Sequence, residues 1–507
     1  MEELYSFVDT EDAERRALYV RGDGRAAGDG CFVLRAGEVA DFFTYFNSFS
    51  LMKWRRYTSL RALFLRVCLE GEAVVEVVGG TASSEAVLAR ETVTDGVQQI
   101  AIPENEAVLV GVRIEARRDC LLRRLAWCGR FDAYRPKRIG AVICTFRREA
   151  YVKRTMEVLR AFQETHDWLD VLVVDNGRTL PLVESRRFRV IGNPNYGGSG
   201  GFTRGMMEYV QRGGVDAVLL MDDDISLETG VLERMQSLLN GVRPEYAESF
   251  LGGAMLDMQH PAVQVENTGH WNGIRFHSLG RGRNLSLKEE LLRNELEDQR
   301  ENQYAAWWFC VMPLSRIETL GYPLPVFLKG DDMEYGMRNQ RPLMCMNGIG
   351  VWHEAFEKKV SDVVNYFSDR NMLILNLFAG GCARWKTMVM IFGRLTKRLI
   401  RRGAGWGAVR MFSLALQDFR RGPEALTRLP ADEKFALVKS YGEGSGTWRF
   451  FGRIFCDTWH IFREYAQLTR TYRAFRQERL GDGRFWTAYL RLGMEEKGSV
   501  CSSSVQH

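Results

Sequence analysis

Residues 217–225, Ala-Val-Leu-Leu-Met-Asp-Asp-Asp-Ile, decide how the rest of the chain is interpreted. The apolar run 217–221 is typical of a strand buried on both faces, as in the parallel sheets of α/β proteins. Three carboxylates cannot belong to the buried part of such a strand. We therefore place Asp222, Asp223 and Asp224 where the strand leaves the sheet, at the edge where open α/β sheets bind ligands.

Two interpretations of this acidic cluster remain open at this point. Adjacent carboxylates repel one another, so the cluster is costly unless a cation lies within it. Hard divalent ions such as Mg²⁺ and Mn²⁺ prefer oxygen ligands and often share them with substrate phosphates, which favours a metal-assisted enzyme acting on a nucleotide diphosphate. A solvated turn that caps a helix beginning near Ser226 explains the same residues equally well.

Neighbouring segments bring other polar residues to the same sheet edge. The buried-type strands 138–145 and 169–175 end in polar turns at Thr145 and Asp175, and a helical stretch separates them. The glycine-rich stretch 193–205 comes next, and a helix leads on to the acidic strand; the stretch suits either a phosphate or a plain flexible loop. Strands that alternate with helices predict crossover connections and a mostly parallel, Rossmann-like sheet.

The flanking regions have different patterns. Residues from about 20 to 130 alternate apolar and polar side chains between turns, which predicts an antiparallel sandwich or jelly roll. Its aromatic and basic patch at 45–57 fits either a sugar contact or a packed core. From about Phe378 the pattern is helical. We therefore divide the chain into a β-sandwich domain (1–133), an α/β domain (134–377), a helical domain (378–493) and a disordered tail (494–507).

Composition narrows the class of protein. The chain has 46% hydrophobic and 26% charged residues, which describes a globular protein rather than a disordered one. Its ten cysteines include no CxxC pair, so neither a zinc site nor a disulfide framework is indicated, and free thiols suit the cytosol. Neither a signal peptide nor a membrane-spanning run is evident. The basic and aromatic C-terminal helices fit an anionic membrane surface, or else a solvated helix face.

Three further motifs carry candidate chemistry. Trp307 and Trp308 form a pair that can stack on a sugar or belong to the core. Asp331 and Asp332 follow an apolar segment; one of them can accept a proton from a hydroxyl, or can cap a helix. His353 ends the short apolar run Gly350-Val351-Trp352, where it is a candidate third metal ligand beside the acidic strand.

The order of these motifs resembles that of the inverting, GT-A-fold family 2 glycosyltransferases. Within that family it is similar to the galactofuranosyltransferases that polymerise mycobacterial galactan. The resemblance extends to about residue 375, with a looser helical match beyond. The matching pieces are Cys144-Thr145-Phe146-Arg147, 195–202, Met221-Asp222-Asp223-Asp224, Trp307-Trp308, 331–336 and Val351-Trp352-His353.

The resemblance implies a GT-A catalytic domain and a set of site residues. Asp222, Asp224 and His353 would hold Mn²⁺ or Mg²⁺ against the pyrophosphate of a UDP-sugar, and Asp332 would be the general base. The acceptor would lie against Trp307, Trp308 and Asp331. Asp223, to which the residues alone give no separate chemical role, is grouped with the donor-binding residues Thr145, Phe146, Arg147, Asp175, Asn195 and Gly200.

The expected activity is transfer of galactofuranose from UDP-galactofuranose to a hydroxyl of a growing cell-surface or lipid-linked glycan. Ser368 stands near a position where the resemblance leads us to expect histidine, so a rhamnosyl or glucosyl donor is an alternative. A more remote alternative is a non-catalytic carbohydrate-binding protein. We expect a cytoplasmic homo-oligomer, peripheral on the inner face of the cell membrane through its C-terminal helices, with no nucleic-acid partner.

Overall fold

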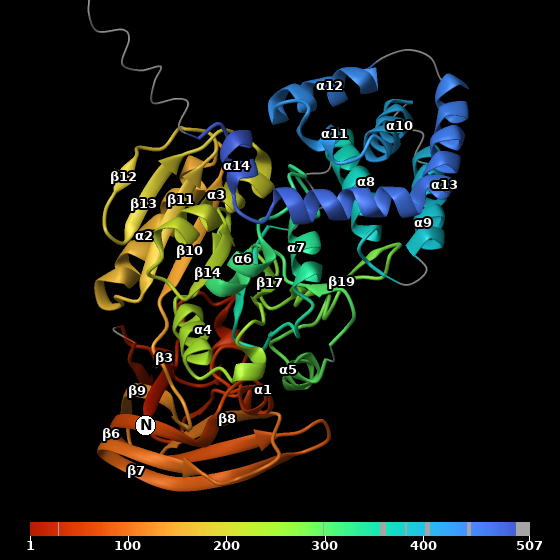
Figure 1. Cartoon of the computed structure of the whole chain (residues 1–507). Helices are drawn as coiled ribbons and strands as arrows, with labels where there is room; N and C mark the ends of the chain where they lie inside the picture. The colour runs from red at the N-terminus through yellow and green to blue at the C-terminus, as the bar shows by residue number, and fades with distance from the viewer. Residues whose placement is uncertain are drawn as a thin grey trace, which may run out of the picture.

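The computed structural model describes residues 1–28, 30–297, 299–354, 361–380, 383–400, 406–443 and 448–492. A β-rich region at the base, an α/β body above it and a group of helices to one side make up this part of the chain (Figure 1). The predicted disordered tail, 494–507, lies outside the described residues.

The N-terminal region is built on the long strand β6 (Leu60–Gly80), which confirms the predicted antiparallel β-structure. β6 pairs along one side with β7 (Glu85–Ile102), and on the other first with β9 (Cys120–Phe131) and then with β8 (Leu109–Ala116). The change of partner falls at Gly71, whose φ is +108° and where a Cβ would lie 2.3 Å from the Asp119 carbonyl oxygen. Only glycine fits there.

The remaining described elements of this region are short. The short strands complete a sheet of nine strands in the described residues, and every pairing in it is antiparallel. These elements are β1 (Glu2–Ser6), β2 (Arg21–Gly22), β3 (Arg25–Ala26), β4 (Phe32–Leu34), β5 (Val39–Asp41) and the helix α1 (Leu51–Tyr57).

The α/β body has a mostly parallel core, as predicted. β10 (Ile139–Thr145) lies between β11 (Leu169–Asp175) and β14 (Ala217–Asp222), and all three run in the same direction. The crossovers are α2 (Glu149–Thr165) and, after β13 (Phe188–Gly192), α3 (Gly197–Arg212). Antiparallel strands β12 (Val183–Glu184), β22 (Phe309–Pro313) and β16 (Leu251–Gly252) complete this sheet.

Beyond β14 the chain forms a second, smaller sheet that adjoins the first. Its strand order is β15 (Ile225–Ser226), β23 (Gly350–His353), β17 (Ala254–Asp257) and β18 (Gln264–Glu266). The antiparallel pairing places Ile225 opposite His353. Two residues distant in the sequence, Asp224 and His353, are therefore brought together by backbone hydrogen bonds.

The other described elements near these sheets are a small sheet and four helices. They are β19 (Gly269–Trp271), β20 (Phe276–Ser278), β21 (Gln303–Tyr304), α4 (Gly230–Asn240), α5 (Lys288–Glu295), α6 (Leu314–Leu320) and α7 (Asp331–Asn339).

The C-terminal part is helical, as predicted, and its first helix, α8 (Asp362–Asn376), reaches back to the α/β body. Among the helices of the described residues, none is long and apolar enough to cross a membrane. The others are α9 (Ala383–Ile400), α10 (Gly407–Arg420), α11 (Glu424–Thr427), α12 (Ala431–Glu443), α13 (Trp448–Arg479) and α14 (Arg484–Tyr489).

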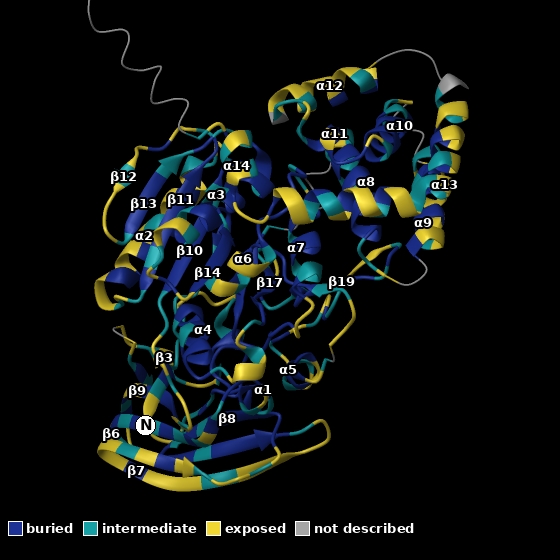
Figure 2. Cartoon of the chain, in the orientation of Figure 1, coloured by how far each residue is buried: buried dark blue, intermediate teal, exposed yellow. Residues whose placement is uncertain are grey.

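The aromatic patch at 45–57 is packed between the N-terminal sheet and the α/β body. Phe46 and Trp54 are fully buried, so the core interpretation is right and the sugar-contact interpretation is wrong. The Phe46 ring lies 5.5 Å from the ring of Trp352 in β23, and the Arg15 guanidinium lies 4.1 Å from the same ring. Figure 2 shows mainly buried ribbon, with some intermediate and exposed segments, where the N-terminal region meets the α/β body. The N-terminal region therefore supports the strand that ends in His353.

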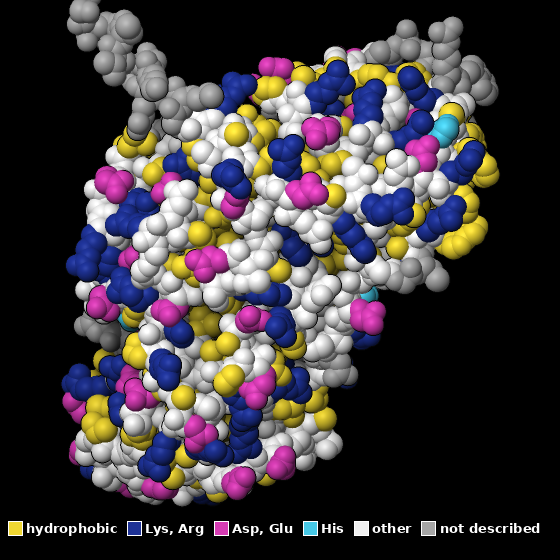
Figure 3. Space-filling model, viewed as in Figure 1, with side chains coloured by type: hydrophobic (Ala, Val, Ile, Leu, Met, Phe, Trp, Pro, Cys, Tyr) yellow, Lys and Arg dark blue, Asp and Glu magenta, His cyan; other side chains and the backbone are white. Residues whose placement is uncertain are grey.

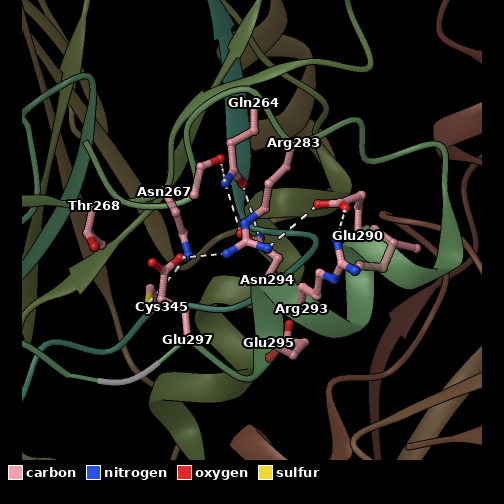
Figure 4. Close-up of polar contacts among 12 residues, drawn as sticks. Gln264, Asn267, Thr268, Arg283, Glu290, Arg293, Asn294, Glu295, Glu297 and Cys345 are labelled. Carbon is pink, nitrogen blue, oxygen red and sulfur yellow. Dashed lines mark hydrogen bonds and ion pairs between the residues drawn. The ribbon is translucent and has the colours of Figure 1, made fainter. Parts of the chain in front are cut away.

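A buried polar network ties the same junction to β18. The side-chain amides of Gln264 and Asn294 donate to each other over 2.8 and 3.1 Å (Figure 4). Asn294 also donates to Asn347 over 2.7 Å, and the Asn347 backbone N–H donates to Glu295. Glu295 in turn lies 3.4 Å from the ammonium group of Lys53, and both side chains are almost wholly buried. A buried ion pair holds the two regions in register.

Substituting Lys53 by alanine should destabilise the protein by about 3–5 kcal/mol, because the Glu295 carboxylate stays buried without its cation. Arg61→Ala is the matched control: its ion pair with Asp132 leaves the two side chains 70% and 53% exposed, and such exposed pairs contribute little to stability. Urea-induced unfolding measures both. Equal losses in the two variants would contradict a structural role for the buried pair.

Candidate active site

The predicted cluster of Asp222, Asp224 and His353 is assembled at the ends of β14 and β23. The Nε2 atom of His353 lies 2.9 Å from Asp224 Oδ1 and 3.5 Å from Asp222 Oδ2. One ligand atom from each residue lies within 4.8 Å of the other two. The competing cap interpretation is wrong, because Ile225 and Ser226 form strand β15 and the next helix begins at Gly230.

The electrostatics of this cluster suit a cation. Burial lowers the pKa of His353, but the hydrogen bonds and charges of Asp222 and Asp224 outweigh it and raise that pKa to about 10. Burial likewise opposes ionisation of Asp224, yet His353 and Arg148 hold the pKa of that carboxyl below its usual range. The cluster thus attracts positive charge strongly.

The donor set also fits a divalent metal. The Nδ1 atom of His353 lies 2.6 Å from the Glu354 carbonyl oxygen. Since a carbonyl only accepts, Nδ1 carries the proton and Nε2 faces the two carboxylates, which is how second-shell hydrogen bonds orient imidazole ligands. Two carboxylates and one imidazole are ligands that Mn²⁺ and related ions accept.

Asp223 is held away from this cluster by β10 and the start of α2. Its carboxylate accepts a hydrogen bond of 2.7 Å from the Thr145 hydroxyl and one of 3.1 Å from Arg148. Burial raises the pKa of Asp223 to about 6, which these two partners partly oppose. Arg148 also pairs with Asp224. Thr145 and Asp223 therefore fasten the two strand ends together.

Sequence reasoning missed Arg148 and selected its neighbours. Phe146 and Arg147 are exposed; Arg147 has a φ of +53°, and its guanidinium lies 5.2 Å from the Phe146 ring. The backbone conformation at Arg147 decides which of three consecutive side chains, from 146 to 148, points toward Asp223 and Asp224. No periodicity in the sequence signals it.

The other predicted donor-binding residues shape loops at the sheet edge. The Asp175 carboxylate accepts backbone N–H groups from Gly177 over 2.8 Å and from Thr179 over 2.6 Å. The Asn195 side chain accepts the N–H of Gly197 over 3.1 Å, and Gly200 is buried in α3, where a Cβ would lie 2.4 Å from that of Tyr196. Their roles in binding stay predictions.

One cavity of about 1030 Å³ joins the cation cluster to the second acidic motif and the tryptophan pair. This volume is of the size that small-molecule sites have. Its lining includes residues from β14, β18, β23, α7 and α8. The predicted site residues among them are Asp222, Asp223, Asp224, His353, Asp331, Asp332, Trp307 and Trp308.

Asp331 and Asp332 are the first two residues of α7. Asp332 accepts the backbone N–H of Met333 over 2.8 Å, but the N-cap position of α7 is Gly330 and no side chain caps the helix, so the cap interpretation is wrong. Burial raises the pKa of both carboxyls, and the Asp332 charge raises that of Asp331 further. A carboxylate whose pKa is raised is a better proton acceptor, as a general base requires.

The two tryptophans and a glutamate form another wall of the cavity. Trp308 donates to the Gly253 carbonyl over 2.8 Å, whereas the buried indole N–H of Trp307 has no partner among the described residues. Glu266, which sequence reasoning missed, is buried with a pKa raised to about 8 by burial, and accepts the Ser278 hydroxyl over 2.6 Å. An isolated glutamate in a three-residue strand carries no sequence signal.

Two family models match parts of the chain. Residues 9–130 match the family described as galactofuranosyltransferase 2 N-terminal, and residues 141–246 match glycosyl transferase family 2. The chain is thus similar to the N-terminal part of galactofuranosyltransferases over residues 9–130 and to family 2 glycosyltransferases over residues 141–246. The predicted α/β fold class, with a mostly parallel central sheet, is confirmed by the strand pairing.

Two curated relatives are galactofuranosyltransferases GlfT2. That of Mycobacterium tuberculosis is 27% identical over 425 residues, covering 77% of this chain and 66% of the relative. That of Mycolicibacterium smegmatis is 27% identical, covering 76% and 64%. The matches thus span about two thirds of each relative.

Among solved structures, S. aureus TarS residues 1–349 has a TM-score of 0.35 at 13% identity, covering 67% of this chain and 92% of that one.

Asp224→Asn should abolish stabilisation of the protein by Mn²⁺. A ligand at one hundred times its dissociation constant stabilises the folded state by about 2.7 kcal/mol, so the thermal midpoint of the unsubstituted protein should rise with added Mn²⁺. Asp216→Asn, at the exposed residue that precedes β14, is the control and should keep the full shift. A shift in Asp224→Asn as large as in the control would contradict the assignment.

Proposed function

We propose that the protein is a metal-dependent, inverting glycosyltransferase that transfers galactofuranose from UDP-galactofuranose to a hydroxyl of a growing glycan. The observation that carries the proposal is the single cavity that holds the cation cluster, the Asp331–Asp332 pair and the tryptophan pair. The two curated relatives, which are named as galactofuranosyltransferases, support the choice of sugar.

The residues divide the reaction between two sides of the cavity. Asp222, Asp224 and His353 would hold Mn²⁺ or Mg²⁺, which offsets the charge that develops on the departing UDP. On the other side, Asp332 accepts the proton of the acceptor hydroxyl. At the same time the oxygen of that hydroxyl bonds to the anomeric carbon. The bond from that carbon to the phosphate oxygen breaks, and attack from the opposite face inverts the configuration.

The acceptor is a cell-surface or lipid-linked glycan that lies against Trp307 and Trp308. Their aromatic faces suit the apolar side of a sugar ring, and the unpartnered N–H of Trp307 suits a hydroxyl. Among alternative donors, rhamnosyl and glucosyl nucleotides stay in contention because Ser368 lines the cavity. The non-catalytic alternative is weakened by the burial of the N-terminal aromatic patch.

The C-terminal helices α9 and α13 form the surface that we assign to a membrane. Trp385, Val389 and Phe392 on α9 are 64%, 55% and 47% exposed, and their spacing puts them on one face. Phe455 and Trp459 are exposed on α13, with the Phe455 ring 6.5 Å from that of Phe392. Figure 3 shows hydrophobic side chains beside Lys and Arg at this edge of the molecule. Apolar residues flanked by cations bind anionic bilayers, and we place the protein on the inner face of the cell membrane.

We also propose that the protein is a homo-oligomer through the same group of C-terminal helices. Exposed apolar residues gathered on one face of α9 support self-association as well as membrane contact. The membrane is the occupant that the adjacent basic side chains favour.

The proposed activity predicts UDP release from UDP-galactofuranose with Mn²⁺ and a galactofuranosyl acceptor, and Asp332→Asn should reduce the rate by about 10²–10⁴-fold. UDP with Mn²⁺ should still raise the thermal midpoint of this variant, because the cation cluster is intact. The acidic limb of the rate should lie above the ordinary aspartate pKa of about 3.9, since burial raises the pKa of Asp332.

The controls test the identity of the general base and the identity of the donor sugar separately. Asp216→Asn should retain full activity. A panel of UDP-galactofuranose, UDP-glucose and dTDP-rhamnose identifies the donor, and turnover with another sugar only would replace galactofuranose in the proposal. An Asp332→Asn enzyme as fast as the unsubstituted one rules out this residue as the base.

Membrane attachment predicts that the protein sediments with phosphatidylglycerol-rich vesicles at low salt. The double variant Trp385→Ser/Trp459→Ser should lose most of this binding, because two exposed anchors disappear. Val97→Ser is the matched control, since Val97 is 70% exposed on the distant strand β7. Equal binding of both variants would exclude α9 and α13 as the attachment surface.

A further inference from the structure

The loop that leads into the Asp331–Asp332 pair has a strained backbone. Phe327, Lys329 and Gly330 have φ angles of +70°, +64° and +91°, so two of the three residues with positive φ in this loop are not glycine. Side chains disfavour positive φ, and such conformations persist where the surrounding structure fixes them. The direction in which α7 starts, and hence the direction of Asp332, depends on this loop.

Asn371 of α8 fixes the loop from one side. Its amide nitrogen lies 2.8 Å from the Leu328 carbonyl oxygen, 2.7 Å from that of Lys329 and 3.2 Å from that of Val326. Asn371 is only 2% exposed. The amide nitrogen of Asn371 thus contacts three carbonyl oxygens of the loop.

The neighbouring Arg370 orients this amide. Its Nε donates to the Asn371 side-chain oxygen over 2.9 Å, and its Nη2 donates to the Val326 carbonyl over 2.8 Å. Arg370 is 1% exposed. With its oxygen engaged by the guanidinium, Asn371 has to present its nitrogen to the loop.

Helix α3 fixes the loop from the opposite side. The Ser199 hydroxyl donates to the Leu324 carbonyl over 2.7 Å, and the Ser199 backbone N–H donates to that of Phe327 over 3.4 Å. A Cβ on Gly197 would lie 2.1 Å from the Phe327 carbonyl oxygen, so only glycine permits this approach. The loop is held between α3 and α8.

We propose that Asn371 is a positioning residue that places Asp332 for proton transfer by clamping the loop Val326–Gly330. This inference rests on the proposed function, because it takes Asp332 as the base. Asn371 is not among the residues that line the cavity, whereas Gly330 and Met372 beside it are. It therefore acts through the loop, and a displacement of about 1 Å in a reacting group can cost about 10²-fold in rate.

Asn371→Asp tests the clamp because aspartate has the same shape but no N–H to donate, and its charge repels the three carbonyl oxygens. Asn376→Asp is the matched control on the same helix: its amide donates over 2.8 Å to Gly273 rather than to the loop, and it is fully buried. Both variants lose a buried amide donor in α8. Only Asn371→Asp should release the loop.

For Asn371→Asp we expect kcat to fall at least 30-fold below that of Asn376→Asp, a bound taken conservatively from the roughly 10²-fold cost of misplacement. The KM for the nucleotide sugar and the Mn²⁺-induced thermal shift should stay within about threefold and a degree or two of those of the unsubstituted enzyme, since the cation cluster lies elsewhere. Hydrogen–deuterium exchange of a peptide covering 324–332 should accelerate in Asn371→Asp alone.

Two failures can be told apart. If the unsubstituted enzyme turns over no nucleotide sugar, the proposed function falls and this inference falls with it. If that enzyme is active and Asn371→Asp matches Asn376→Asp in kcat, or the loop exchanges no faster, the inference alone is overturned. Loss of donor binding in parallel with kcat also overturns it, because the effect would then be general unfolding.

Discussion

Mutual repulsion among three consecutive carboxylates is the constraint on which the site depends. The structure resolves it by sending the three side chains to different partners at the end of β14. Asp222 and Asp224 turn to His353, while Asp223 turns to Thr145 and Arg148. Arg148 also pairs with Asp224, so His353 and Arg148 together offset the repulsion among the three carboxylates. This arrangement works only while β23 lies beside β15, so the small sheet is as necessary to the site as the large one.

The N-terminal region secures that small sheet. Trp352, next to His353, lies between Phe46 and Arg15, and the buried pair of Lys53 and Glu295 ties the same region to α5. A domain that contributes no described residue to the cavity thereby sets the position of a metal-ligand candidate. Burying an ion pair is seldom the most stabilising solution, but it penalises every other way of docking the two parts. We therefore attribute the buried Lys53–Glu295 pair to the selection of one docking geometry rather than to a gain in stability.

Sequence patterns predicted the architecture well because hydrophobic periodicity and strand-end polarity are local. The strand that ends at Asp222 and the order of the motifs along the chain can both be recognised without knowing which distant segments contact each other. Arg148, Glu266 and Asn371 were not predicted, and each depends on a contact between segments distant in sequence. The sequence does not distinguish Arg148 from Arg147, because a single turn at positive φ decides which side chain faces inward. Composition does not show whether the aromatic patch is core or a sugar contact, since burial against another domain is a tertiary property.

The two acidic motifs of one cavity have opposite electrostatic environments, and this explains their different roles. Asp224 is surrounded by His353 and Arg148, which keep it ionised and ready to share a cation. Asp331 is buried and Asp332 is partly buried beside it, so the pKa values of both carboxyls rise and they hold a proton more readily. Groups of one chemical type whose pKa values are pushed apart take separate tasks in a reaction. Stabilising a leaving diphosphate needs permanent negative ligands for a cation, whereas deprotonating a hydroxyl needs a carboxylate of raised basicity. The strained loop before Asp331 lets a single cavity contain both, because it directs the second pair into the same space, where burial outweighs the opposing charge of Lys329.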